Sequence, residues 1–247
     1  MPNWVAEFHP FTWMHGLTLV WTVGAIVASC VMGRRWVAQG GAGDVKELKL
    51  AVGWAGFTIG VNLWSIVYWL LPLNFTLKES LPIQLCDIAC LIAPLVLLTE
   101  WRTPRALMFF WGIGLSTQAF VTPTLLEGPG DMKFYLFWLV HLCIVGTAIY
   151  DVAVRRYRPT VRDLLVAIAA SIMYLLAMIA VNHFLDSNYG FVGDQLRARP
   201  TPVDRLGPWP QRVFTMTAIA IGGFCVMWFV SGVIERFKRA STQDGQV

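Results

Sequence analysis

Seven long apolar segments constrain this chain more than any other feature of its sequence. They are almost free of charge, and most have about the 20 residues that a helix needs to cross a bilayer. The segments cover residues 14–32, 50–71, 81–99, 106–121, 134–152, 164–184 and 213–234. Each is continuously apolar, which favours helices over the alternating strands of a barrel. The sequence therefore predicts an all-α polytopic membrane protein, a bundle of seven transmembrane helices.

The composition supports this interpretation, and the basic residues indicate an orientation. The chain is 56% hydrophobic and 14% charged, whereas soluble domains carry roughly 25% charged residues. Thirteen of the 19 Lys and Arg residues lie in the first, third and fifth loops and the C-terminal tail, and six lie on the opposite side. Because cytoplasmic loops are enriched in Lys and Arg, we expect the N-terminus outside and the C-terminus in the cytoplasm. The net charge of +4 is thus a topology signal, and no nucleic-acid partner is expected.

The predicted organisation is a single seven-helix membrane domain, residues 1–239, with a disordered cytoplasmic tail, residues 240–247. The longest loop, residues 185–212, lies on the outer side and is rich in Gly, Pro, Arg and Asp. Loops of this length are usually functional or disordered, so we expect a lid over the outer face. An inverted-repeat transporter has no support, because the sequence has no internal repeat. All five cysteines fall inside apolar segments, which argues against a secreted disulfide framework.

A small set of polar side chains lies inside these segments or at their ends. A carboxylate in the middle of a membrane costs roughly 2.5–3.5 kcal/mol on insertion scales, so such groups usually face a protein interior or a wet cavity. At ~1.5 Å per residue, Cys86 lies about 8 Å and His141 about 10 Å below the outer starts of their segments. Most of the set falls in the outer half of the bilayer, which predicts one shared, outward-facing cavity. The set comprises His15, Asn62, Gln84, Cys86, Asp87, Gln118, His141 and Asn182.

The third segment carries an unusual concentration of these groups at its outer end. Ser80 is expected to cap its helix, with Pro82 in the first turn and Pro94 producing a kink further in. Cys86 and Asp87 differ by ~100° around the helix axis, so they are expected to meet different neighbours. Asp87 either borders the cavity or holds helices together by bonding a His or an Asn.

Two alternatives remain open for the cysteine and the histidine. Cys86 is either a small packing residue or a nucleophile activated by His141, which is otherwise a hydrogen-bond partner between helices. The amides of the polar set would then orient the histidine or stabilise an oxyanion. Cys86, Cys90 and His141 form only a weak zinc set without the paired spacing of known sites. Neither a metal nor a cofactor is expected.

Four short motifs give the chain a family resemblance. "LPIQLCDIA", "GPGD", "FWLVHL" and "NYGFVG" resemble the YwaF-like family of bacterial integral membrane proteins, over residues 10–235. The resemblance implies a multi-pass protein of the bacterial inner membrane, related to eukaryotic phospholipid acyltransferases. It assigns Cys86 and His141 as the catalytic pair, with Asn188 and Tyr189 of "NYGFVG" among the supporting residues. Many bacterial members of that family have His where this chain has Gln84.

Two functional hypotheses follow. The first is a membrane-embedded acyltransferase or lipid hydrolase that acts on phospholipid acyl chains through a Cys86 nucleophile and a His141 base, with membrane lipid as its substrate. The second is a non-enzymatic transporter or ligand sensor whose polar cavity binds a small solute, in which Asp87 and Asn62 would matter more than Cys86. The acyl donor, the acceptor and the oligomeric state are left open by the sequence.

Overall fold

The chain is helical throughout in the computed structural model, which describes residues 4–195 and 201–244. Within these ranges the only β-type pairing is a single bridge between Glu7 and Glu127. The elements are α1 (Trp13–Gly40), α2 (Val45–Leu70), α3 (Leu85–Leu98), α4 (Arg102–Leu107), the π-helix η1 (Met108–Leu115), α5 (Gln118–Val121), α6 (Met132–Ala153), α7 (Val161–Leu185), the 3-10 helices η2 (Tyr189–Phe191) and η3 (Pro202–Leu206), and α8 (Gln211–Asp244). The predicted all-α class is confirmed for the described residues.

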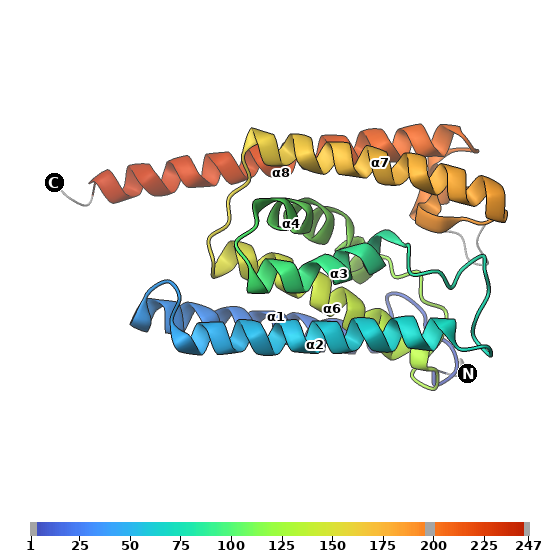
Figure 1. Ribbon diagram of the computed structural model, residues 1–247, viewed down its shortest axis with the longest axis horizontal. Coiled ribbons are helices and arrows are strands. Elements are labelled where there is room, and N and C mark those ends of the chain that lie inside the picture. The colour runs from blue at the N-terminus through green and yellow to red at the C-terminus, as the bar shows by residue number, and fades with distance from the viewer. Residues whose placement is uncertain (1–3, 196–200, 245–247) are drawn as a thin grey trace.

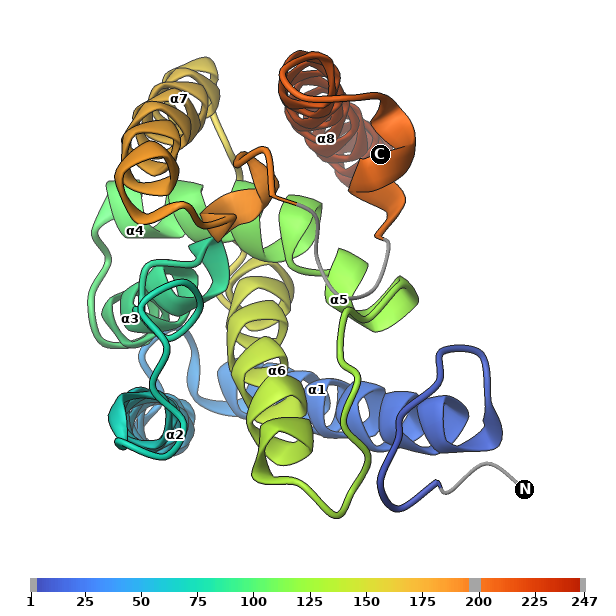
Figure 2. The same cartoon turned by 90° about the vertical axis from the view of Figure 1, so that its right-hand side faces the viewer.

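The helices pack in three layers (Figure 1). α1 and α2 form one outer layer, α7 and α8 form the other, and α3, α4 and α6 lie between them. The end-on view in Figure 2 shows the same order, with α6 between α1 and α4. α6 is the central element, because it packs against α1, α2, α3 and η1. A residue that faces α3 from α6 is therefore deep in the protein.

The outer helices expose large apolar side chains. Met173 and Leu176 of α7 and Phe214 and Phe229 of α8 are all exposed at the protein surface. Apolar surface of this extent is characteristic of a protein that contacts lipid. α1, α2, α6, α7 and the Gln211–Phe237 part of α8 are long and apolar enough to cross a membrane. The chain is accordingly a polytopic membrane protein, while the count of seven crossings and their orientation stay predictions.

The third helix starts later than the sequence predicts. It begins at Leu85 rather than at residue 81 and has 14 residues, about 21 Å of helix. The Asp87 carboxylate accepts the Gln84 backbone N–H at 2.9 Å, which caps the helix there. Ser80 is not the cap of this helix, because its hydroxyl instead accepts the Thr76 N–H and closes the preceding turn. The predicted cap and first turn were therefore wrong.

The predicted fourth helix, residues 106–121, is broken into α4, η1 and α5. The Ser116 N–H bonds the Trp111 carbonyl at 2.8 Å, five residues back, which is the π-helical pattern. Gly112 allows close contact with α6, since a Cβ there would lie 2.8 Å from the Cβ of Ala148. Gly114 likewise allows close contact with Phe224 of α8. Tight packing on two sides thus accompanies the departure from a regular helix.

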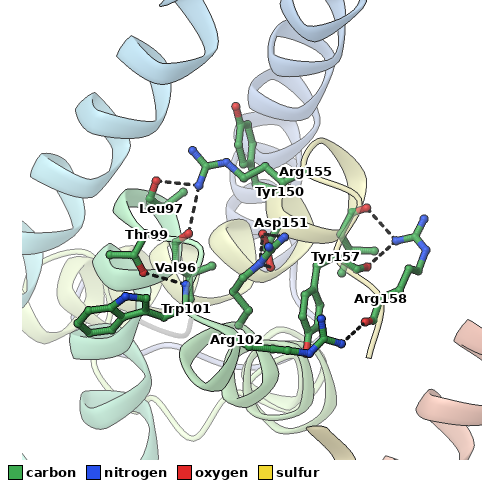
Figure 3. Close-up of polar contacts among 12 residues, drawn as sticks. Val96, Leu97, Thr99, Trp101, Arg102, Tyr150, Asp151, Arg155, Tyr157 and Arg158 are labelled. Atoms are coloured by element: carbon green, nitrogen blue, oxygen red, sulfur yellow. Dashed lines mark hydrogen bonds and ion pairs between the residues drawn. The ribbon is translucent and has the colours of Figure 1, made fainter. Parts of the chain in front are cut away.

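One end of the bundle is rich in arginine, and Figure 3 shows Arg102, Arg155 and Arg158 there. Arg155 donates to Glu47 at 3.0 Å and to the carbonyls of Val96 and Leu97 at the end of α3. Tyr150 also donates to Glu47, at 2.9 Å. The sequence identified Arg155 only as an orientation marker, but with Tyr150 of α6 it links α2 and α3 to the end of α6.

Two further ion pairs lie at the same arginine-rich end of the bundle. Arg105 of α4 pairs with the buried Asp151 of α6 at 2.9 Å, and Arg102 pairs with Asp163 of α7 at 2.6 Å. The guanidinium of Arg105 also stacks over the ring of Tyr157.

α8 continues to Asp244, so residues 240–244 of the predicted tail are helical. Residues 245–247 lie outside the described residues.

Candidate active site

The thiol of Cys86 and the imidazole of His141 are in contact. Cys86 Sγ lies 3.3 Å from His141 Nε2, although 55 positions separate the residues in the chain. Cys86 comes from α3 and His141 from α6, which pack side by side through the middle layer (Figure 1). A nucleophile and a base must be within hydrogen-bonding reach, and this pair satisfies that geometric requirement.

The other ring nitrogen of His141 determines which tautomer faces the thiol. His141 Nδ1 lies 2.7 Å from the carbonyl oxygen of Phe137, one turn earlier on α6. Because a carbonyl only accepts hydrogen bonds, Nδ1 carries the proton and donates it. Nε2 of the neutral ring then presents its lone pair to Cys86, as a general base requires.

The imidazole is held in place by packing as well as by this hydrogen bond. His141 is 7% exposed. Its ring lies 4.4 Å from the Phe137 ring, centroid to centroid. Few alternative orientations are available to a ring enclosed in this way, so Nε2 remains directed at α3.

The position of Cys86 in its helix also matters. α3 begins at Leu85, so Cys86 is its second residue. The first N–H groups of an α-helix have no partner inside the helix, and the positive end of the helix dipole stabilises nearby negative charge. A thiolate or an oxyanion formed next to Cys86 would lie at that end. Because α3 begins at Leu85 rather than at residue 81, Cys86 lies in the first turn, where the helix dipole stabilises negative charge.

An apolar core surrounds the inner side of the pair. Cys86 packs against a buried cluster that includes Val61, Cys90, Val140 and Ile144. Asn62 of α2 reaches this cluster and hydrogen-bonds the Cys90 thiol, one turn along α3 from Cys86. Asn62 is therefore adjacent to the pair and is engaged with Cys90.

Asp87 and Gln84 both make contacts that fix the start of α3. The Asp87 carboxylate caps α3 by accepting the Gln84 N–H, so it does not bond a His or an Asn of another helix in a described contact. The Gln84 side chain accepts the Gly190 N–H at 3.0 Å through Oε1. This contact joins the start of α3 to the outer loop.

The outer loop is anchored at η2. Asn182, at the end of α7, donates to the Tyr189 carbonyl at 2.9 Å and accepts the Tyr189 N–H at 2.7 Å. The Tyr189 hydroxyl donates to the Leu77 carbonyl and accepts the Leu81 N–H. Tyr189 is fully buried, so it fastens the loop to the segment that precedes α3.

Other contacts extend the same anchoring. Asn188 accepts the Gly193 N–H at 3.0 Å and donates to the Gln195 carbonyl. Asp186 pairs with Lys78, which lowers the pKa of that carboxyl through a hydrogen bond and charge attraction. The described part of the predicted lid is thus fastened over the start of α3. Arg197 and Arg199 of the same loop lie outside the described residues.

His15 and Gln118 do not join the pair. His15 accepts the Phe11 N–H at Nδ1 and donates from Nε2 to the Phe120 carbonyl at 2.9 Å. It ties the N-terminal segment to α5 inside an aromatic cluster with Trp138. Gln118 is exposed on α5. The predicted polar set is therefore distributed among the pair, the helix cap, the loop anchor and an aromatic cluster.

Sequence reasoning missed two backbone groups that shape the site. The Phe137 carbonyl sets the histidine tautomer, and the Gly190 N–H fastens Gln84. The Phe137 contact could have been found, because the carbonyl four residues before any helical residue lies on the same face of the helix.

The described residues contain no group of three or more His, Cys, Asp or Glu side chains arranged to hold a metal ion.

Comparison with known proteins identifies one family. Residues 10–228 match the TMEM164 family, which is a membrane protein family. No curated protein and no solved structure matches the chain. The YwaF-like designation and the relation to acyltransferases gain no support from the match and stay predictions. Because the match covers most of the sequence, the chain belongs to the TMEM164 family.

Proposed function

We propose that this protein is a membrane-embedded acyl-transfer enzyme in which Cys86 is the nucleophile and His141 the base. One observation carries the proposal: Cys86 Sγ lies 3.3 Å from His141 Nε2, on the nitrogen that is left unprotonated by the Phe137 hydrogen bond. A thiol paired with an imidazole in this way is the arrangement of cysteine acyl-transfer enzymes.

The first half-reaction forms a thioester. His141 Nε2 takes the Cys86 proton while Sγ attacks the acyl carbonyl of a phospholipid ester, and a tetrahedral intermediate forms. The intermediate collapses by breaking the ester C–O bond. The departing lysophospholipid oxygen receives the proton from Nε2, which leaves an acyl-Cys86 and a neutral imidazole.

The second half-reaction transfers the acyl group to an acceptor hydroxyl. His141 Nε2 removes the acceptor's proton as its oxygen attacks the thioester carbonyl. The C–S bond breaks, and the proton on Nε2 returns to the Cys86 sulfur. With a lysophospholipid as acceptor the enzyme is an acyltransferase, and with water it is a lipid hydrolase.

The start of α3 supports charge stabilisation during both steps. The positive end of the α3 dipole stabilises the oxyanion of each tetrahedral intermediate. This role replaces the one expected of Gln84 and Asn182, whose side chains are engaged in fastening the outer loop.

A membrane lipid suits this position. Cys86 is half-buried at the outer end of a short helix. Ester carbonyls of a bilayer lie just below the headgroups, at the depth of the ends of transmembrane helices. The proposed orientation, with the N-terminus outside, assigns this site to the outer leaflet.

The test is acyl transfer by purified protein in vesicles that contain a phospholipid with a labelled acyl chain and an unlabelled lysophospholipid. Cys86→Ser and His141→Ala are each expected to lower turnover by about 100-fold or more. Cys225→Ser and His183→Ala are matched controls, because both residues are exposed on other helices, and they should retain turnover. Full turnover by the Cys86 and His141 variants would overturn the proposal. Binding of a polar solute without any turnover would favour a transporter or sensor.

A further inference from the structure

A second site lies at the arginine-rich end, far along the chain from Cys86. A cavity of about 240 Å³ opens between the loop that joins α6 to α7 and the last apolar turns of α8. It is lined by Arg158, Pro159, Ser231, Gly232, Glu235 and Arg236. Since a water molecule occupies about 30 Å³ in the liquid, the cavity has room for a phosphate group with bound waters.

Arg158 lines one wall of this cavity, and Figure 3 shows its contacts with two backbone carbonyls. Its Nη1 donates to the carbonyls of Val152 at 3.1 Å and Tyr157 at 2.6 Å. Its Nε lies 3.5 Å from the Glu235 carboxylate and makes no hydrogen bond among the described residues. The guanidinium is therefore positioned by two backbone carbonyls and by its ion pair with Glu235.

The wall formed by α8 carries a second arginine and a glycine that leaves room in the cavity. Arg236 of α8 is a second arginine in the lining, so the cavity residues include two arginines and one glutamate, Glu235. Ser231 places a hydroxyl group on the same turn of α8. A Cβ added at Gly232 would have no atom within 4 Å, so this glycine leaves the cavity open. Guanidinium groups are suited to phosphate because their paired N–H donors match its oxygens.

The position of the cavity relative to the membrane-spanning helices indicates which kind of phosphate compound it can meet. The apolar run of α8 ends at Ile234, where the charged Glu235 and Arg236 follow, and Ser231, Gly232, Glu235 and Arg236 line the cavity at this end. α6 ends at Ala153 and α7 begins at Val161, so Arg158 lies in the connection between two spanning helices. Lipid headgroups occupy this boundary of a bilayer, and basic pockets at such positions bind anionic headgroups.

We propose that the cavity formed by Arg158, Ser231, Gly232 and Arg236 binds the phosphate of an anionic phospholipid headgroup in the leaflet at the arginine-rich end. The site is separate from the Cys86–His141 pair and does not depend on its chemistry. A lipid bound there would link α8 to the α6–α7 loop through its headgroup.

The test is native mass spectrometry of purified protein in neutral detergent, titrated with phosphatidylglycerol or phosphatidylcholine. Wild-type protein is expected to retain phosphatidylglycerol preferentially. Arg236→Gln should weaken its binding by about fivefold, the effect expected from one basic group near the headgroups. Gly232→Leu should weaken it at least as much by filling the cavity, without removing any charge.

Two controls separate this site from general charge and from altered helix packing. Gly223→Leu adds the same bulk on α8 where a new Cβ also meets nothing within 4 Å. Arg35→Gln removes an exposed arginine of α1 at the same end. Both should bind phosphatidylglycerol like wild type. Equal binding of the two lipids by wild type, or unaltered binding by Gly232→Leu and Arg236→Gln, would overturn the proposal. Displacement of the lipid by inorganic phosphate at equal concentration would overturn the lipid assignment in favour of a soluble phosphate.

Discussion

Cys86 Sγ and His141 Nε2 lie 3.3 Å apart, across the contact between α3 and α6. His141 Nδ1 keeps its proton and donates it in a hydrogen bond to the Phe137 carbonyl, so Nε2 accepts from the thiol rather than donating to it. The thiol also lies in the first turn of its helix, where negative charge is stabilised. These features distinguish Cys86 from the other four cysteines.

The first prediction concerns the reactivity of Cys86. With a lipid-soluble alkylating reagent, Cys86 should react faster than the buried Cys90 and Cys143, because its thiolate is stabilised by the helix end and by proton transfer to His141. His141→Phe should slow alkylation of Cys86 by about 100-fold. Peptide mass spectrometry after timed labelling measures both rates. Alkylation of the exposed Cys225 is the internal control, and an unchanged Cys86 rate in His141→Phe would contradict the pairing.

The second prediction separates the cap role of Asp87 from a catalytic one. Asp87→Ala should lower the free energy of unfolding by about 1 kcal/mol, because the N–H at the start of α3 loses its acceptor. Asp87→Asn keeps an acceptor and should be milder. Thermal unfolding in detergent measures the difference, and acyl transfer by Asp87→Asn should remain close to wild type. Loss of turnover in a normally stable Asp87→Asn protein would show that the carboxylate does more than cap the helix.

The third prediction concerns the anchoring of the outer loop by Tyr189. Tyr189→Phe keeps the buried ring but removes the hydroxyl that bonds Leu77 and Leu81. Leaving such buried partners unsatisfied costs roughly 1–3 kcal/mol. Hydrogen exchange of residues 77–84 should accelerate, while exchange in the centre of α6 should not change. The matched variant is Tyr135→Phe, since Tyr135 is exposed, and it should leave exchange in residues 77–84 unaltered.

The fourth prediction concerns the ion pair between Glu47 and Arg155. Glu47 is buried and accepts from both Arg155 and Tyr150. Glu47→Gln leaves the Arg155 charge without its partner, so it should destabilise the protein by about 3–5 kcal/mol. Glu100→Gln, at an exposed site, should have almost no effect on the melting temperature. Equal melting temperatures for the two variants would mean that the pair does not hold α2 to α6.

The sequence predicted the helical class, because that class depends on short-range information. Apolar length predicts membrane helices. Counting residues from the predicted helix starts placed Cys86 and His141 at similar depths. Contact between them was not predictable from depth alone, since it also depends on which faces of α3 and α6 meet.

The missed features depend on tertiary contacts. The break in the fourth segment accompanies close packing at Gly112 and Gly114, which periodicity does not reveal. Gln84 and Asn182 looked like cavity amides, but both bond the backbone of the outer loop. A polar side chain in an apolar segment can satisfy a distant backbone group as readily as it can line a site.

The most direct test of the central claim is mass spectrometry of the Cys86 peptide after brief exposure of the purified protein to phospholipid without acceptor. Acyl transfer through this pair predicts an acyl mass on Cys86 that hydroxylamine removes, as it removes thioesters. The same adduct should be absent in His141→Ala and present in His183→Ala. Acyl transfer that proceeds with no adduct on Cys86, or with an adduct of equal yield in His141→Ala, would contradict the account.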